Sequence, residues 1–88
     1  RPGPGVQGDE DLLAFARAYG ATIFHPSGTC RMGADPQAVV DPELRFNGIA
    51  GLRVVDASVM PQVVSSNTNA PTIMIAEKAA DLIKGATA

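Results

Sequence analysis

Only one histidine occurs in the chain, His25, and it lies in the segment FHPSGTCRMG at residues 24–33. Its imidazole has an unperturbed pKa of about 6.5, so His25 is the natural candidate for a general acid or base near neutral pH. Pro26 favours an extended backbone at His25, and Gly28 makes the loop permissive to the close approach of a ligand. A lone histidine is, however, more often a structural residue that is hydrogen-bonded inside a turn. The residue on its own leaves both roles open.

Cys30 is the only cysteine of the chain. His25 and Cys30 are too few to ligate a metal without further cysteine or histidine, so we expect no metal site. Cys30 is better explained as a small buried residue than as a nucleophile. A single cysteine also excludes an internal disulfide and suits a reducing compartment, which predicts a cytoplasmic protein.

A second polar segment, SSNTNA at residues 65–70, precedes an apolar stretch. Asn69 or Thr68 can cap the free N–H groups of a helix that begins here. The N-terminus of a helix also attracts anions, and Asn67 would stand just outside it, free to hydrogen-bond a substrate oxygen. Capping and ligand binding are compatible, so both stay open.

Asp56 and Ala57 follow the mostly apolar run at 52–55. In α/β proteins, a strand that ends in a turn of small residues commonly presents backbone amides to a cofactor. The alternative is an ordinary exit from the strand, in which Asp56 pairs with Arg53 or Arg31.

Two helices must position these residues, over about 9–19 and about 71–84. The first begins with three acidic residues, as the helix dipole favours, and Gly20 suits its C-terminal cap. Short strands are predicted at about 22–24, 44–46 and 52–55, with Asn47-Gly48 as a turn signal after the second. The predicted fold class is an α+β fragment.

The last predicted helix is apolar around most of its circumference. Its polar residues form one narrow stripe, which comprises Glu77, Lys78, Asp81 and Lys84. Such a helix is expected to be buried on several sides, and two short strands and one other helix can hardly supply that burial. We therefore expect the 88 residues to be part of a larger protein, with the Pro/Gly-rich start RPGPGVQGDE as an internal segment.

The composition excludes several partners. A content of 45% hydrophobic and 18% charged residues is ordinary for a globular protein. A net charge of −2 gives no electrostatic reason to expect nucleic acid or an anionic membrane. No apolar run approaches the roughly 20 residues that span a bilayer.

Three segments together resemble the C-terminal block of the glucose-methanol-choline (GMC) oxidoreductases. In order, they are FHPSGTCRMG, VVDPELRFNGIAGLRVVDASVMP and SSNTNAPTIMIAEKAADLI. The resemblance covers about residues 9–84 and implies an FAD enzyme that oxidises an alcohol by passing hydride to the flavin N5. With an asparagine at position 67, the chain resembles the choline dehydrogenase and bacterial alcohol dehydrogenase branch more than the glucose oxidase branch.

The resemblance also implies roles for particular residues. His25 would act as the base on the substrate hydroxyl, and Asn67 would hydrogen-bond the substrate oxygen. Asp56 and Ala57 match the turn that approaches the FAD pyrophosphate and ribityl chain, and Asn67 and Thr68 match the stretch beside the flavin. A reduced flavin carries negative charge along its N1–C2=O edge, which the N-terminus of the last helix would stabilise.

The GxGxxG segment that binds the dinucleotide in this family is absent from these residues. The chain alone should therefore bind FAD poorly, and its expected partners are an alcohol substrate and the missing N-terminal FAD-binding part. We divide the chain into an extended segment at 1–8, a substrate-side part with the catalytic loop at 9–70, and a terminal helix at 71–88 that packs on the FAD domain.

Two other functions stay open at this point. An FAD-containing hydroxynitrile lyase shares the scaffold and also uses a histidine. The chain could also be a non-catalytic fragment that associates with itself through its apolar helix.

Overall fold

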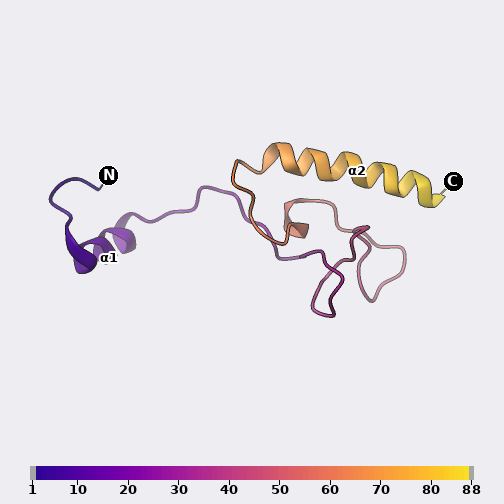
Figure 1. Ribbon diagram of the computed structural model, residues 1–88, viewed down its shortest axis with the longest axis horizontal. Coiled ribbons are helices and arrows are strands. Elements are labelled where there is room, and N and C mark those ends of the chain that lie inside the picture. Colours follow the sequence, from indigo (N-terminus) through magenta and orange to yellow (C-terminus); the bar gives the residue numbers. More distant parts are fainter. Residues whose placement is uncertain (1, 88) are drawn as a thin grey trace.

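The computed structural model describes residues 2–87, with only the backbone of Thr87 (Figure 1). In chain order, the helical elements of this range are the α-helix α1 (Gly8–Tyr19), the short 3₁₀ helix η1 (Ala57–Val59) and the α-helix α2 (Asn69–Thr87). Both predicted α-helices are confirmed, and each is longer than its sequence pattern indicated. Within residues 2–87, no helix has the length and apolar character needed to cross a bilayer.

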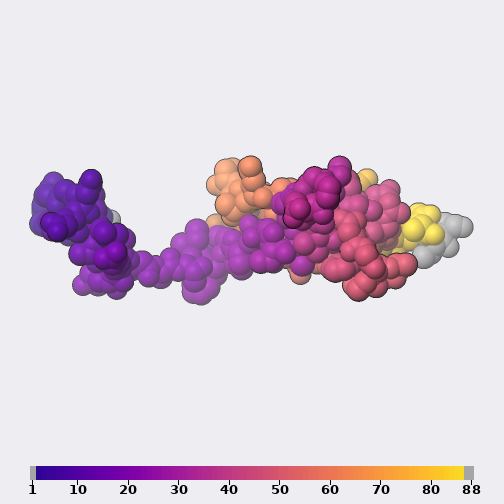
Figure 2. Space-filling model, turned by 90° about the horizontal axis from the view of Figure 1, so that it is seen from below, coloured from indigo at the N-terminus to yellow at the C-terminus, as the bar shows by residue number. Residues whose placement is uncertain are grey.

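The described chain is elongated, with principal extents of 63 × 27 × 16 Å. Its radius of gyration is 18.6 Å, whereas a compact chain of this length would have about 12 Å. Helix α1 lies at one end, and a narrow stretch of chain joins it to the rest (Figures 1 and 2). None of the residues of α1 is buried, so this helix contributes nothing to the core that the described residues form.

The ends of α1 follow the expected helix chemistry. Acidic residues occupy its first turn and Arg17 its last turn, so both ends complement the helix dipole. The N–H of Gly20 donates to the carbonyl of Ala16 at 2.7 Å and closes the C-terminus.

The three predicted strands are wrong as strands. Among residues 2–87, pairing is limited to isolated bridges, which join Met32 with Val40, Val40 with Phe46, and Arg45 with Arg53. The predicted segments 44–46 and 52–55 do lie side by side, since the N–H of Phe46 donates to Leu52 at 2.8 Å. The segment 22–24 forms no bridge at all.

Backbone geometry explains why the extended runs stop so early. Phe24 and Leu44 both have a φ of +66°, the left-handed region that non-glycine residues rarely adopt. Leu44 stands at the start of one predicted strand and Phe24 at the end of another. A residue in this conformation interrupts the extended backbone that is required for continuous strand pairing.

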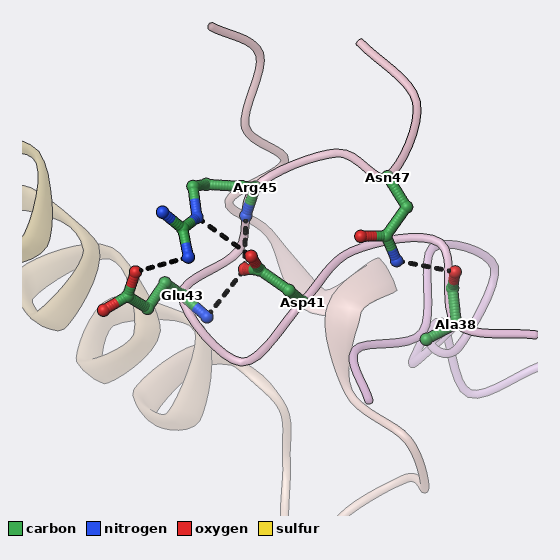
Figure 3. A network of polar contacts seen from close by, with 5 residues as sticks. All are labelled: Ala38, Asp41, Glu43, Arg45 and Asn47. Atoms are coloured by element: carbon green, nitrogen blue, oxygen red, sulfur yellow. Dashed lines mark hydrogen bonds and ion pairs between the residues drawn. The ribbon is translucent and has the colours of Figure 1, made fainter. Parts of the chain in front are cut away.

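The loop between the bridges is held by a network of polar contacts around Asp41 (Figure 3). The Asp41 carboxylate accepts hydrogen bonds from the N–H groups of Glu43 and Arg45 and from Nε of Arg45, all between 2.9 and 3.0 Å. Partial burial raises the pKa of Asp41, but the hydrogen bonds from Arg45 and Glu43 outweigh it and lower the pKa overall. Asn47 donates to the carbonyl of Ala38 at 3.0 Å and ties the two ends of the loop together.

The core is small and lies between this loop region and one side of α2. It consists of six buried residues, which are Val40, Leu44, Val59, Met60, Ile75 and Ala79. Two of them belong to α2, whereas Ile73 and Met74 of the same helix are 54% and 60% exposed. Helix α2 is therefore covered on one side only by the residues described.

Candidate active site

His25 lies in the extended segment that joins α1 to the body of the molecule, and its side chain is half-buried. Its Nδ1 atom lies 2.9 Å from the hydroxyl oxygen of Thr68. The turn before it is shaped by Thr22, whose Oγ1 accepts a hydrogen bond from the N–H of Phe24 at 2.9 Å. Pro26 follows His25 and disfavours a helical backbone at that residue. The structure thus brings together two of the residues that the sequence singled out.

Thr68 is the residue immediately before α2, and its backbone is firmly held. Its carbonyl accepts two hydrogen bonds from Thr72, one from the N–H at 2.9 Å and one from Oγ1 at 2.7 Å. The Thr68 hydroxyl is directed to His25 and not to a helix N–H group. Neither Thr68 nor Asn69 caps α2 with its side chain within residues 2–87, so the capping role considered for these residues is not observed.

The segment that follows His25 runs along η1. The N–H of Cys30 donates to the carbonyl of Ser58, and that of Met32 donates to the carbonyl of Val59, both at 2.9 Å. Gly28 has a φ of +89°, a conformation that favours glycine. These contacts connect the histidine loop to the turn that contains Asp56 and Ala57.

Asp56 caps η1 and pairs with no arginine among residues 2–87. Its Oδ1 accepts hydrogen bonds from the N–H of Ser58 at 2.8 Å and from the Ser58 hydroxyl. Asp56 is exposed, whereas Ala57 is partly buried against the core. The proposed alternative of an Asp56 ion pair with Arg53 or Arg31 is therefore wrong.

Arg31 is engaged elsewhere, in a two-point ion pair with Asp35. The distances from Nη1 to Oδ1 and from Nη2 to Oδ2 are 2.9 and 2.8 Å. The hydrogen bonds from Arg31 lower the pKa of Asp35 to about 2. The pair closes the turn that leads away from the histidine loop.

The polar segment before α2 offers free hydrogen-bonding groups. Asn67 and Asn69 are exposed, and their side chains make no hydrogen bond within residues 2–87. The N–H groups of Asn69 and Ala70 in the first turn of α2 likewise have no acceptor in this range, as is usual at a helix N-terminus. Such a set of N–H and amide donors fits the carbonyl and ring-nitrogen acceptors of a flavin pyrimidine edge. The residues present are thus chemically suited to FAD.

An open apolar hollow of about 650 Å³ adjoins His25. Its lining comprises Thr22, Ile23, Phe24, His25, Pro26 and Val63. Ile23 and Phe24 are 78% and 79% exposed, and this volume is in the range of small-molecule sites. Val63, which is 58% exposed, was not predicted as a site residue, because a valine in the sequence carries no signal of its exposure.

Known proteins resemble this chain over most of its length. The family model for GMC oxidoreductase matches residues 1–76. Mitochondrial choline dehydrogenase of Homo sapiens is 60% identical over 87 residues, which is 97% of this chain and 15% of that protein. Alcohol dehydrogenase [acceptor] of Pseudomonas putida is 58% identical over 82 residues, 93% of this chain and 15% of that protein.

A solved structure has the same fold. The crystal structure of pyridoxine 4-oxidase from Mesorbium loti superimposes with a TM-score of 0.81 at 42% sequence identity. The match covers 89% of this chain and 16% of that one. The chain thus spans about one sixth of the length of the proteins it matches.

Proposed function

The chain belongs to the GMC oxidoreductase family, and from this we propose that it forms the C-terminal, active-site part of an FAD-dependent enzyme that oxidises the CH–OH group of an alcohol. The observation that supports the proposal most directly is the 2.9 Å contact between His25 and Thr68. It joins the histidine loop to the start of α2, the two segments that carry the reacting groups under this proposal. Relatives named for choline, alcohol and pyridoxine support an alcohol as the substrate class.

His25 is the base in this proposal. It takes the proton of the substrate hydroxyl, and Asn67 orients the substrate oxygen by a hydrogen bond from its side-chain amide. A half-buried imidazole beside an apolar hollow suits this task, because the hollow can hold the carbon part of an alcohol while the ring faces its hydroxyl.

The cofactor would be held by two parts of the chain. The exposed turn at Asp56 and Ala57 would face the pyrophosphate and ribityl chain, and Asn67, Thr68 and the first N–H groups of α2 would face the flavin. When bound, FAD supplies the acceptor for the hydride that leaves the substrate carbon. The dinucleotide-binding part belongs to the remainder of a longer protein, since relatives are more than six times as long as this chain.

The division of the chain into residues 1–8, 9–70 and 71–88, with the last part packed on an FAD domain, stays a prediction. The exposed apolar residues Ile73 and Met74 of α2 support it, because they are available to such a domain. The cytoplasmic location also stays a prediction, which the single cysteine supports.

The test is flavin reduction in the complete enzyme that contains this segment. Under anaerobic conditions, an alcohol should bleach the flavin absorbance of the unmodified enzyme, which a lyase would not need to do. His25→Ala should slow this bleaching by about 100- to 10,000-fold, because general-base catalysis contributes about that much. Gln37→Ala, an exposed substitution outside the site, is the matched control and should reduce its flavin at the normal rate. Near-normal reduction in His25→Ala would refute the assignment.

A further inference from the structure

We infer that Thr68 is a positioning residue, whose hydroxyl accepts a hydrogen bond from Nδ1 of His25 and so keeps Nε2 available as the base. The inference rests on the proposed function of His25 and adds a residue to it. It assigns to the Thr68 side chain a task that is separate from any contact of its backbone with a cofactor.

The contact has the geometry of a genuine hydrogen bond. The two heavy atoms are 2.9 Å apart, and both residues are half-buried. It is the only side-chain hydrogen bond of His25 within residues 2–87. The hydroxyl is therefore the one described hydrogen-bonding partner that can orient the imidazole.

The position of Thr68 adds a second argument. A threonine directly before a helix usually turns its hydroxyl onto an N–H group of the first turn. Here the hydroxyl leaves α2 uncapped and bonds to a residue 43 positions away in the chain. The Thr68 hydroxyl therefore helps to position the imidazole and not to cap the helix.

The backbone of Thr68 is stiff enough to hold the ring in place. Its carbonyl is bound twice by Thr72, and Pro71 lies in the first turn of α2, where its missing N–H costs no hydrogen bond. Because the backbone of Thr68 is constrained in this way, its hydroxyl can hold the imidazole in one position.

The direction of the hydrogen bond decides whether His25 can act as a base. A neutral imidazole carries one proton, on either Nδ1 or Nε2. If Nδ1 carries it and donates to Thr68, Nε2 has a free lone pair and can take the substrate proton. Once protonated on both nitrogens, the ring still donates from Nδ1 to the same oxygen, so the contact persists through the proton transfer. The opposite tautomer would place a proton on Nε2 and block the base.

The charge of the acceptor determines how strongly it stabilises the protonated imidazole. A hydroxyl is neutral, so it stabilises the imidazolium less than a carboxylate would. Removal of the hydroxyl should nevertheless lower the limiting reduction rate, because part of the histidine then adopts the unproductive tautomer.

The experiment compares four variants of the complete holoenzyme. Thr68→Val keeps the shape and removes the hydroxyl, Thr68→Ser keeps the hydroxyl, and Thr68→Ala removes it from a smaller side chain that cannot clash. Ser65→Ala is the control, because it removes an exposed hydroxyl of the same segment that makes no hydrogen bond within residues 2–87. Rates of anaerobic flavin reduction are measured per bound flavin as a function of pH and of alcohol concentration.

Thr68→Val and Thr68→Ala should lower the limiting reduction rate about 10- to 100-fold, as expected for the loss of a hydrogen bond to a charged group. The substrate Kd should change little, and Thr68→Ser should restore the rate. A purely structural role would reduce the flavin content and leave the rate per bound flavin unchanged. Unchanged rates and pH profiles in both hydroxyl-free variants would overturn the inference while His25→Ala remained impaired, whereas an active His25→Ala would overturn the proposed function itself.

Discussion

Nδ1 of His25 and Oγ1 of Thr68 are 2.9 Å apart, although the two residues are 43 positions apart in the sequence. The contact joins the extended segment after α1 to the residue that precedes α2. The histidine loop has a second attachment further on, where Cys30 and Met32 donate to the η1 turn. The three segments that the family resemblance selected are thus connected by hydrogen bonds within one small region of the chain.

Thr72 should influence the site through Thr68. Its hydroxyl donates to the Thr68 carbonyl at 2.7 Å, and Thr72→Val removes this bond but keeps the one from the N–H at 2.9 Å. We expect a loss of about 1 kcal/mol in the free energy of unfolding and a small decrease in the flavin-reduction rate. Denaturant unfolding and anaerobic flavin reduction of the complete enzyme measure the two effects. A decrease in rate larger than that of Thr68→Val would contradict the proposal that Thr72 acts on the site through Thr68.

The helices could be predicted from the sequence because their signals are local. The acidic first turn of α1, the glycine at Gly20 and the apolar run of α2 each act within a few residues of one another. The strands could not, because a strand requires a partner along its whole length. Only isolated bridges form within residues 2–87. The positive φ of Leu44 and Phe24 interrupts the extended runs, and neither residue type predicts this conformation.

The candidate site residues could be predicted from the family resemblance, whereas their contacts were found only in the structure. Thr68 was expected beside a cofactor or as a helix cap, and no local pattern indicates that its hydroxyl reaches His25. The partner of Asp56 was also missed. The sequence pattern pointed to an arginine, whereas the carboxylate bonds to Ser58, only two residues away.

Ala79 offers a matched test of the core. It is 1% exposed, whereas the next residue of α2, Ala80, is exposed. Ala79→Leu should destabilise the chain by about 1–3 kcal/mol, because the added atoms have no space in a packed core. Ala80→Leu should change the stability by less than about 0.5 kcal/mol. Thermal unfolding followed by far-ultraviolet circular dichroism compares the two, and equal losses would contradict the packing of α2 described above.

Helix α1 should be the least stable element of the isolated 88-residue chain. It has 12 residues, none of them buried, and a helix of this length is marginal in water without tertiary contacts. In a hydrogen-exchange experiment, the amides of Gly8–Tyr19 should exchange much faster than those around Ile75 and Ala79 in α2. Equal protection of both helices would contradict this expectation.

The isolated chain should also associate with itself. Apolar side chains remain exposed along its length, among them Leu13 at 50%, Phe24 at 79% and Met74 at 60%. Analytical ultracentrifugation should detect species heavier than a monomer, and Ile73→Glu together with Met74→Glu should shift the distribution towards the monomer. A cooperatively folding monomer of the unmodified chain would refute this expectation.

The ion pair between Arg31 and Asp35 predicts an acid-dependent loss of stability. The hydrogen bonds from Arg31 lower the pKa of Asp35 from 3.8 to about 2. A carboxyl whose pKa is lower in the folded state stabilises the protein above its unfolded-state pKa, and this contribution disappears as the pH falls through the folded-state value. The complete enzyme should therefore be more stable than its Asp35→Asn variant near neutral pH, and the difference should shrink as the pH falls from about 4 towards 2. Because both side chains are partly exposed, at 34% and 48%, added salt should reduce the difference as well. Denaturant unfolding of both proteins across this pH range measures it, with Gln37→Ala as a neighbouring exposed control. A difference that stays constant down to the lowest pH would show that the pair does not keep the Asp35 carboxylate ionised as described.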